Sequence, residues 1–485
     1  MNYRIIARNV GLALLVSALF MFLSIVVSML HSNDAALVPL TISFLITFIV
    51  GAFPFIFVRK PGRISLTEGY LIIVLSWLLS FVFGMLPYAL YGDPFTLENA
   101  WFESVSGFTT TGATILEDIE SLPDSLLFWR NATHFIGGLG VVVFLLLIIP
   151  DTSPIRLKLT NMEISSLSRD TYSTKAGKSV WIFAYVYIGI FLAACISYWL
   201  AGMSFFDAVI HAMSVCSTGG FSNKNLSIGS FDSAAINLIT ILFMFIASVH
   251  FGLIFMAFAS RTLKPFKNPV FRFYVIALVI CSVTESVALK TEGSFKDWGS
   301  SFMSGTFHVV SYASTTGFAI GDNSTWGMFP STILIIVSLF CGCAGSTTGG
   351  IKIDRLLVAF KAIANKVQDA IHPNSVNEIR VGRHILHFND IYPHILYITL
   401  YFIVLLISTV VCLFFSPDSR DAIYGSIATL SSIGPSIGDT IGSLGNFNHF
   451  PIALKFIFSL NMFLGRIEIY PLLAVLSMLL SSHKK

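Results

Sequence analysis

The chain has 485 residues and a formal net charge of +3, and 55% of its residues are hydrophobic while only 11% are charged. Its mean hydropathy is +0.80. A water-soluble domain could not bury that much apolar surface, so the composition indicates a polytopic helical membrane protein embedded in the lipid bilayer. The sequence has no nucleic-acid-binding motif. Its cysteines form no CxxC pair and fall in or beside apolar segments, as small buried hydrophobic residues do.

Long apolar runs predict ten membrane-spanning helices. Each run is long enough to cross a hydrocarbon core of about 30 Å at about 1.5 Å per residue. The runs lie near 9–30, 37–58, 69–92, 125–150, 178–202, 234–259, 270–290, 329–360, 391–416 and 449–481. We expect the first to be retained and not cleaved as a signal peptide, because no small-residue cleavage site follows it.

Four apolar segments between these spans are too short to cross the membrane. They lie near 99–109, 207–217, 304–314 and 421–431. Ten residues of helix reach only about 15 Å, half of the hydrocarbon core. We therefore expect re-entrant half-helices.

The distribution of charge predicts the orientation of the chain. Ten spans place both termini on one side, and the loops on that side carry most of the basic residues, such as Arg59, Arg156 and Lys264. The positive-inside rule makes that side cytoplasmic. The opposite loops are acidic, which would concentrate cations at a pore entrance. Alternatively, these acids are only the solvated complement of the basic side.

An internal repeat follows the half-helices. Four strings align without gaps: TTTGA at 109–113, STGGF at 217–221, STTGF at 314–318 and SSIGP at 431–435. They share the glycines Gly112, Gly220, Gly317 and Gly434. Thirteen residues before each glycine stands a favoured helix N-cap residue, namely Asn99, Asp207, Ser304 and Asp421.

The repeat predicts an all-α polytopic membrane protein with four tandem span–pore-helix–span units around one pseudo-fourfold pore, preceded by two extra transmembrane helices. The predicted divisions are 1–66 for the N-terminal pair, 67–155, 156–264 and 265–388 for the first three pore repeats, and 389–485 for the fourth.

The chemistry expected of these repeats is cation binding. Each half-helix enters from the outer side, so its carboxyl end brings partial negative charge into the membrane. Backbone carbonyls that follow can replace the hydration shell of an ion, and glycine permits the dihedral angles that this path needs. The alternative is four loops that contain glycine by chance. The predicted filter, with potassium bound at its carbonyls, comprises Thr110, Thr111, Gly112, Thr218, Gly219, Gly220, Thr315, Thr316, Gly317, Ser432, Ile433 and Gly434.

The four strings differ from one another in sequence. Only the second has two adjacent glycines, Gly219 and Gly220. A symmetric stack of carbonyl cages, as in the TVGYG filters of potassium channels, is therefore not expected. We predict fewer well-formed ion sites and weaker discrimination of potassium from sodium.

The segment CGCAGSTTGG interrupts the span near 329–360. Such a run cannot form a sturdy helix, and open backbone at membrane depth must be buried in protein or line a water-filled cavity. We predict a gate below the filter; the alternative is a static kink that helps helices to pack. The predicted gate residues are Cys341, Gly342, Cys343, Ala344, Gly345, Ser346, Thr347, Thr348, Gly349, Gly350 and Arg466.

Arg466 lies deep in the last predicted span. An intramembrane arginine is costly and usually faces a cavity or a partner. Here it could act as an electrostatic barrier to cations and donate to loop carbonyls, or it could extend towards the cytoplasmic headgroups.

The repeat plan resembles the Trk/Ktr/HKT superfamily of potassium transport proteins. Four stretches look specifically like bacterial TrkH proteins: WFESVSGFTTTGAT, WRNATHFIGGLGVVVF, CGCAGSTTGGIK and GRIEIYPLL. The resemblance implies passive potassium uptake, an intramembrane gate loop, and a homodimer in the bacterial inner membrane. It also implies regulation by a cytoplasmic TrkA-like ring that binds NAD and ATP or ADP. No nucleotide-binding motif or cofactor is expected in this chain, apart from the transported K+.

Two other functions fit the sequence less well. Discontinuous spans also occur in secondary transporters that couple a cation to protons or sodium, but these four units share one orientation. An enzyme would need paired acids, HExxH or a nucleophile–base pattern, which the spans lack. His211 and His308, nine residues before their glycines, are interpreted as packing or hydrogen-bonding residues. The basic loops 151–178 and 361–388 are either docking surfaces for the regulatory partner or ordinary positive-inside loops.

Overall fold

The computed structural model describes residues 2–58, 65–148, 176–373, 378–382, 384–415, 418–438 and 440–482. These are almost entirely helical. The exception is a short antiparallel hairpin of β1 (Ile379–Val381) and β2 (His384–Leu386), in which Arg380 pairs with Ile385. Arg59, Arg156 and nearly all of the predicted 151–178 loop lie outside the described residues.

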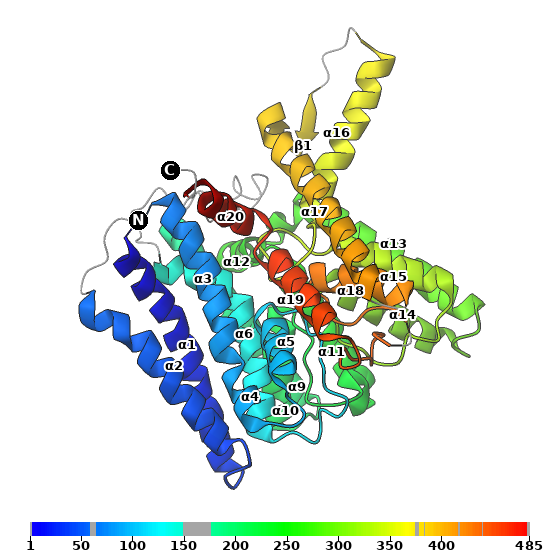
Figure 1. Cartoon of the computed structure of the whole chain (residues 1–485). Helices are drawn as coiled ribbons and strands as arrows, with labels where there is room; N and C mark the ends of the chain where they lie inside the picture. The colour runs from blue at the N-terminus through cyan, green and yellow to red at the C-terminus, as the bar shows by residue number, and fades with distance from the viewer. Residues whose placement is uncertain are drawn as a thin grey trace.

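The first two helices form a hairpin at one side of the bundle. α1 (Tyr3–Leu30) and α2 (Leu37–Phe57) lie side by side, and α1 also packs against the body of the protein (Figure 1). Large apolar side chains of α2 stay exposed, including Ile49, Phe53 and Ile56. An apolar face of this size indicates contact with lipid.

The remaining helices repeat one plan four times: a span, a short helix and a second span. The first set is α3 (Leu66–Gly84) with α4 (Leu86–Tyr91), α5 (Leu97–Phe108) and α6 (Asp124–Ile148). The second is α9 (Ala176–Leu200), α10 (Phe205–Ser217), α11 (Ala234–Ser248) and α12 (Phe251–Ser260). The third is α13 (Pro269–Thr291), α14 (Trp298–Ala313), α15 (Met328–Phe340) and α16 (Ile353–Ile371). The fourth is α17 (Phe388–Phe415), α18 (Ser419–Leu430), α19 (Ile452–Arg466) and α20 (Tyr470–Ser482). Short 3-10 turns cover Ser227–Phe231 and Lys264–Lys267.

Several predicted spans are broken rather than continuous. Among the described residues, six helices are long and apolar enough to cross a membrane. α11 and α12 meet at a 99° bend, residues 341–352 separate α15 from α16, and residues 467–469 separate α19 from α20. The predicted run 449–481 is therefore not one helix. Apolarity alone sets the length of a run and does not reveal a break inside it.

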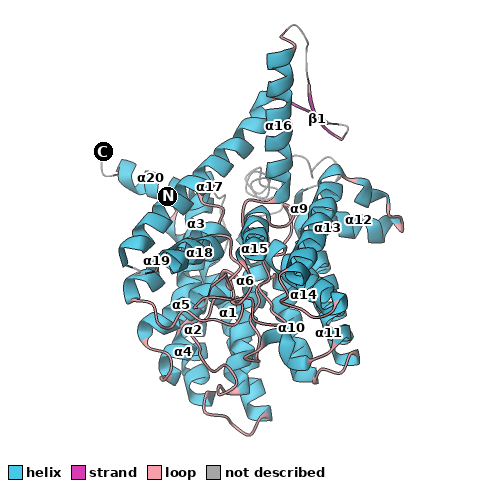
Figure 2. Ribbon diagram, turned by 90° about the vertical axis from the view of Figure 1, so that its right-hand side faces the viewer, coloured by secondary structure: helices cyan, strands magenta, loops and turns pink. Residues whose placement is uncertain are grey.

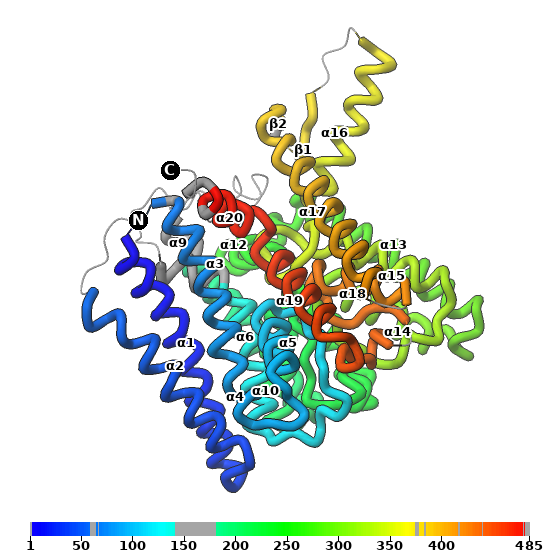
Figure 3. The backbone as a smooth tube through the Cα atoms, in the orientation of Figure 1, coloured from blue at the N-terminus to red at the C-terminus, as the bar shows by residue number. Residues whose placement is uncertain are grey.

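The start of α1 and the end of α20 lie at the same end of the bundle (Figure 3), as an even number of crossings requires. α16 and the β hairpin extend beyond the helical body (Figure 2). This projection follows directly on the interrupted span of the third repeat, so the interruption is continuous with a structure outside the bundle.

The four short helices begin earlier than the sequence predicted. Their N-cap side chains are Thr96, Ser204, Asp297 and Asp418, each accepting from a backbone amide of the first turn. Asn99, Asp207 and Asp421 stand three residues later, inside the first turn, and Ser304 is deeper still in α14. The N-cap prediction was wrong because polar residues are favoured both at the cap and three residues after it.

Candidate ion pathway and intramembrane loop

Each of the four strings has the same backbone path despite its different sequence. Two residues before the shared glycine, the chain adopts left-handed dihedrals, with φ of 53° at Thr110, 54° at Thr218, 53° at Thr315 and 57° at Ser432. Such angles are uncommon for side chains other than glycine and are outliers for β-branched threonine. The shared glycines follow with φ between 76° and 85°. Strain of this kind persists only where surrounding structure holds it in place, typically at functional sites.

One hydrogen bond closes the carboxyl end of every short helix. The amide just before the shared glycine donates to the carbonyl five residues earlier, at 3.0, 2.9, 2.9 and 2.9 Å in the first to fourth strings. The acceptors are Ser106, Ser214, Ser311 and Ala428. This is the long helix-ending bond that accompanies a left-handed residue. It fixes the point at which each string leaves its helix.

The strings form a closed ring. A Cβ added to Gly112 would lie within 3.0 Å of the Gly219 carbonyl oxygen in the second string. The same holds for Gly220 against Thr316 O, Gly317 against Ile433 O, and Gly434 against Thr111 O, which returns to the first string. The structure thus brings the four predicted glycines together, and no larger residue fits where each α-carbon meets its neighbour's backbone.

The second glycine of the second string has a different role. Gly219 lacks a positive φ, and its missing side chain leaves space for the ring of His134 in α6, whose Nδ1 would lie within 3.0 Å of an added Cβ. His134 also stacks on Phe221 with ring centroids 4.0 Å apart, and its Nδ1 lies 3.1 Å from Ser214 Oγ. Sequence reasoning identified the double glycine but not the residue that requires it.

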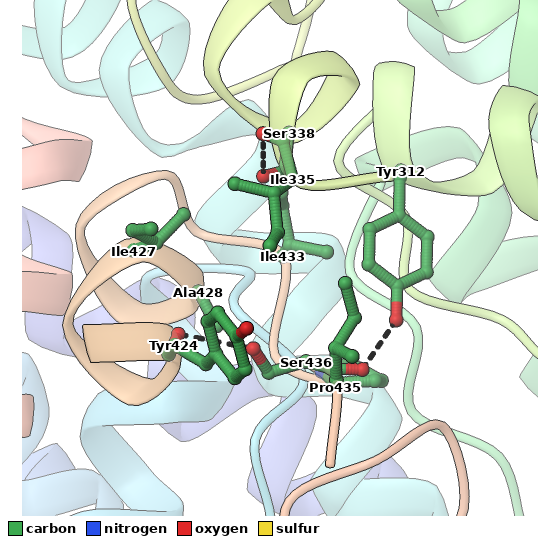
Figure 4. Close-up of a pocket in the computed structure, with 10 residues that line it drawn as sticks. Tyr312, Ile335, Ser338, Tyr424, Ile427, Ala428, Ile433, Pro435 and Ser436 are labelled. Atoms are coloured by element: carbon green, nitrogen blue, oxygen red, sulfur yellow. Dashed lines mark hydrogen bonds between the residues drawn. The ribbon is translucent and has the colours of Figure 1, made fainter. Parts of the chain in front are cut away.

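Hydrogen bonds to α14 and α18 hold the segment that follows the fourth string. Figure 4 shows the Tyr312 side chain reaching the chain beside Pro435, where its hydroxyl donates to the Ser436 carbonyl at 2.6 Å. Ser436 Oγ in turn donates to the Tyr424 carbonyl at 3.0 Å. A small and mainly apolar pocket lies between these residues and α15. The third repeat therefore contributes to holding the string of the fourth.

The interruption of the third repeat is a buried loop of residues 341–352. It begins and ends with left-handed residues other than glycine, Cys341 at φ 46° and Lys352 at φ 71°. It pairs with the bend between α11 and α12: Cys343 N donates to Ser248 O at 2.9 Å, and Phe251 N donates to Gly345 O at 3.0 Å. The loop and the bend both interrupt helices at membrane depth, and their backbone amides and carbonyls form hydrogen bonds with each other. Buried backbone groups need such partners because no water is available in the hydrocarbon region.

The far end of this loop contacts the ring. Gly349 N donates to Thr315 Oγ1 of the third string at 3.1 Å. A Cβ on Gly349 would lie within 3.0 Å of the Ser431 carbonyl, at the end of α18. Thr347 Oγ1 lies 3.3 Å from the Cys216 carbonyl near the end of α10. The loop thus contacts the end of α10 in the second repeat, the end of α18 in the fourth repeat, and the string of its own repeat, the third.

Arg466 holds the loop from the fourth repeat. Its Nη1 donates to Thr347 O at 2.7 Å, and its Nη2 donates to Gly137 O of α6 at 2.8 Å. Arg466 therefore donates to one carbonyl of the loop, a contact that the sequence analysis gave as one of two alternatives. Arg466 is the last residue of α19, not a mid-helix residue, so its charge also lies at the negative end of a helix dipole.

The end of the loop is fixed by two further cations. Lys352 is buried and donates to the Thr348 carbonyl. One turn on, Arg355 forms an ion pair with Glu468 at 2.6 Å and lies over the Tyr397 ring at 3.8 Å. Glu468 lies in the break between α19 and α20, so this ion pair joins the third and fourth repeats.

Sequence reasoning missed a buried ion pair next to the ring. Arg130 Nε lies 2.6 Å from Glu103 Oε1, and the two side chains are 1% and 0% exposed. Neither residue was assigned a role from the sequence. The signal that could have found them is the register, since Glu103 stands nine residues before its glycine, where the second and third repeats have His211 and His308.

The comparisons with known proteins agree with this geometry. Residues 38–485 match the family model described as TrkH, cation transport protein. The chain is 32% identical to the Trk system potassium uptake protein TrkH of Vibrio parahaemolyticus over 98% of this chain and 99% of the relative. It is 31% identical to the Escherichia coli protein of the same name over 98% of each.

A solved structure is equally similar. The crystal structure of the potassium transporter TrkH from Vibrio parahaemolyticus superposes with a TM-score of 0.88 at 30% identity, covering 98% of this chain and 99% of that one. These comparisons confirm the resemblance found in the sequence and the helical membrane fold. The chain belongs to the TrkH family of cation transport proteins.

Proposed function

We propose that the chain is a channel-like potassium uptake protein that conducts passively through the ring of four strings. The observation that carries the proposal is the ring itself, in which four strings with one backbone path close on one another through their glycines. The potassium uptake named for the relatives supports the choice of ion.

The proposed ion site uses main-chain oxygens. Four helix carboxyl ends supply about half an elementary charge each, and carbonyls replace water around a dehydrated cation. An inside-negative potential contributes about 2.3 kcal/mol per elementary charge per 100 mV, so uptake needs no chemical step. Four strings of different sequence form the ring, and each contributes one shared glycine to it. This supports the prediction that discrimination against sodium is weaker than in a symmetric channel.

The loop 341–350 and Arg466 are proposed as the gate. In the present conformation the loop is buried beneath the ring and held by Arg466 through Thr347. Conduction would require the loop to leave this position, and its glycines permit such a change. The many contacts of the loop also fit the static-kink alternative, which variants that loosen it can test.

Assembly and location are proposed from the family. The protein would sit in the bacterial inner membrane with both termini in the cytoplasm, as a homodimer with one pore in each protomer. A cytoplasmic TrkA-like protein that binds NAD and ATP or ADP would regulate it. The projecting α16 and hairpin are the parts of the 361–388 loop that such a partner could reach.

The experiment is rubidium and sodium flux into proteoliposomes containing the purified full-length chain. We expect rubidium uptake that follows its own electrochemical gradient and is lost in Gly220→Ala. Uptake that stops when a proton or sodium gradient is removed would instead establish the symport alternative. The absence of flux in both wild type and Arg466→Ala would overturn the proposal.

A further inference from the structure

The Glu103–Arg130 pair touches the chain immediately after two neighbouring strings. Glu103 accepts from Thr114 Oγ1 at 3.0 Å and from Ile115 N at 3.1 Å, two and three residues after the glycine of the first string. Arg130 Nη1 donates to Ser222 O at 2.9 Å, two residues after the glycine of the second string. One ion pair therefore connects the outgoing segments of the first and second strings.

Arg130 also contacts the second string through an aromatic ring. Its guanidinium carbon lies 3.5 Å from the centroid of Phe221, the residue that follows Gly220. His134, one turn further along α6, stacks on the same ring at 4.0 Å. A planar guanidinium makes such a stacking contact and several directed hydrogen bonds together, which a lysine ammonium cannot.

The equivalent position is a glutamate in the first repeat, a histidine in the second and third, and a glycine in the fourth. Nine residues before the shared glycine stand Glu103, His211, His308 and Gly425. His211 Nε2 lies 2.9 Å from Ser222 Oγ, so Ser222 is held by Arg130 at its carbonyl and by His211 at its hydroxyl. Gly425 instead makes room for the ring of Phe458. At this position, a polar side chain forms hydrogen bonds with the segment after the first string and the segment after the second. In the fourth repeat, the absence of a side chain leaves space for an apolar ring.

Burial makes this pair a demanding arrangement. Taking either charge out of water alone would cost several kcal/mol in free energy, and removing one partner leaves the other uncompensated. Here Glu103 accepts three kinds of donor and Arg130 is paired, so no net charge is added beside the cation path. An unpaired arginine at the same place would repel cations.

We propose that Glu103 and Arg130 are positioning residues that fix the first and second strings in the ring and thereby set its discrimination between potassium and sodium. The proposal rests on the proposed function, since it assigns selectivity to the same ring. The two residues act through Ser222 and Ile115 and do not touch the ion themselves. The pair contacts the segments that follow the first and second strings only, so its loss would distort only part of the ring.

The test compares Glu103→Gln, Arg130→Lys and the double variant Glu103→Gln/Arg130→Met in the proteoliposome assay, with rubidium and sodium fluxes measured on the same preparations. We expect the rubidium-to-sodium flux ratio of Glu103→Gln to fall about tenfold, the factor produced by about 1.4 kcal/mol in relative ion stabilisation. Arg130→Lys keeps the charge but loses the planar stacking contact, so its ratio should be intermediate.

The double variant separates positioning from simple destabilisation. It removes both buried charges, so its thermal midpoint should recover relative to Glu103→Gln, whereas its flux ratio should stay low. The control is Glu378→Gln, which breaks an exposed pair with Arg380 of the same 2.6 Å length and should change nothing. Folded variants with the wild-type flux ratio would overturn the positioning role. The absence of cation flux in both the wild type and Arg466→Ala would instead refute the proposed function.

Discussion

Arg466 and Thr347 connect the last helix of the fourth repeat to the interrupted span of the third. The Nη1 of Arg466 donates to the Thr347 carbonyl at 2.7 Å, while its Nη2 reaches Gly137 of the first repeat at 2.8 Å. One side chain therefore joins three repeats at the level of the loop. Its second donor keeps the guanidinium in place if the loop moves.

Replacing Arg466 with alanine should raise cation flux. The change removes two hydrogen bonds from a charged donor, each contributing about 1.5–3 kcal/mol, and it removes a positive charge from the proposed cation path. We expect rubidium uptake to increase by about tenfold, the effect of about 1.4 kcal/mol on the closed loop. The matched control is Arg380→Ala, an exposed arginine of the hairpin. Equal fluxes in all three proteins would argue that the loop is a static kink.

The two glycines of the second string should respond differently to alanine. A Cβ on Gly220 would collide with the Thr316 backbone, which cannot give way, and its φ of 84° disfavours any side chain. The three atoms nearest to a Cβ on Gly219 all belong to the His134 side chain. We therefore expect Gly220→Ala to abolish uptake in every background, while Gly219→Ala should regain it when His134 is also changed to alanine.

Rubidium flux and thermal midpoint should be measured for both single variants and both His134 combinations. Rescue of Gly220→Ala by the same change would mean that the collision lies in side chains and that the ring is not closed by backbone.

Much of the ring could be predicted from the sequence because its repeat is local. Each shared glycine sits at a fixed distance from a short helix, and the backbone dihedrals around Gly112 or Gly434 depend on neighbours along the chain. Features that depend on contacts between residues far apart in the sequence could not be predicted. The Glu103–Arg130 pair joins residues of different helices. The bend at Val249–His250 is stabilised by pairing with a loop about a hundred residues away.

The loop illustrates both outcomes. Its glycines marked the interruption of the span, and Gly349 indeed lies against the ring. The predicted loop ended at Gly350, whereas Ile351 and Lys352 also precede the first turn of α16. Local composition shows that a helix must break, whereas the residue at which the next helix begins depends on packing.

Adding a methyl group at Gly349 should push the loop away from the ring. An alanine Cβ there would meet the Ser431 carbonyl, so the loop must shift away from the ring, weakening the Gly349–Thr315 hydrogen bond. We expect Gly349→Ala to raise rubidium uptake without changing the rubidium-to-sodium ratio. Gly189→Ala in α9, where nothing lies within 4 Å, is the control. A lower flux in Gly349→Ala would place the residue in the conducting ring itself.

Two buried glutamates should behave in opposite ways when changed to glutamine. Glu103 is paired with Arg130, whereas Glu285 in α13 is fully buried and neither of its carboxyl oxygens has a hydrogen-bond partner among the described residues. An ionised carboxylate in that position would be very costly, so we expect Glu285 to be protonated. Glutamine has nearly the same shape and is also neutral, so Glu285→Gln should keep the thermal midpoint and flux of the wild type.

Glu103→Gln should lower the midpoint, because it leaves the buried Arg130 uncompensated at a cost of about 3–5 kcal/mol. Thermal unfolding of the two variants in detergent, side by side, measures the contrast. Equal losses would show that Glu285 is ionised and held by a partner.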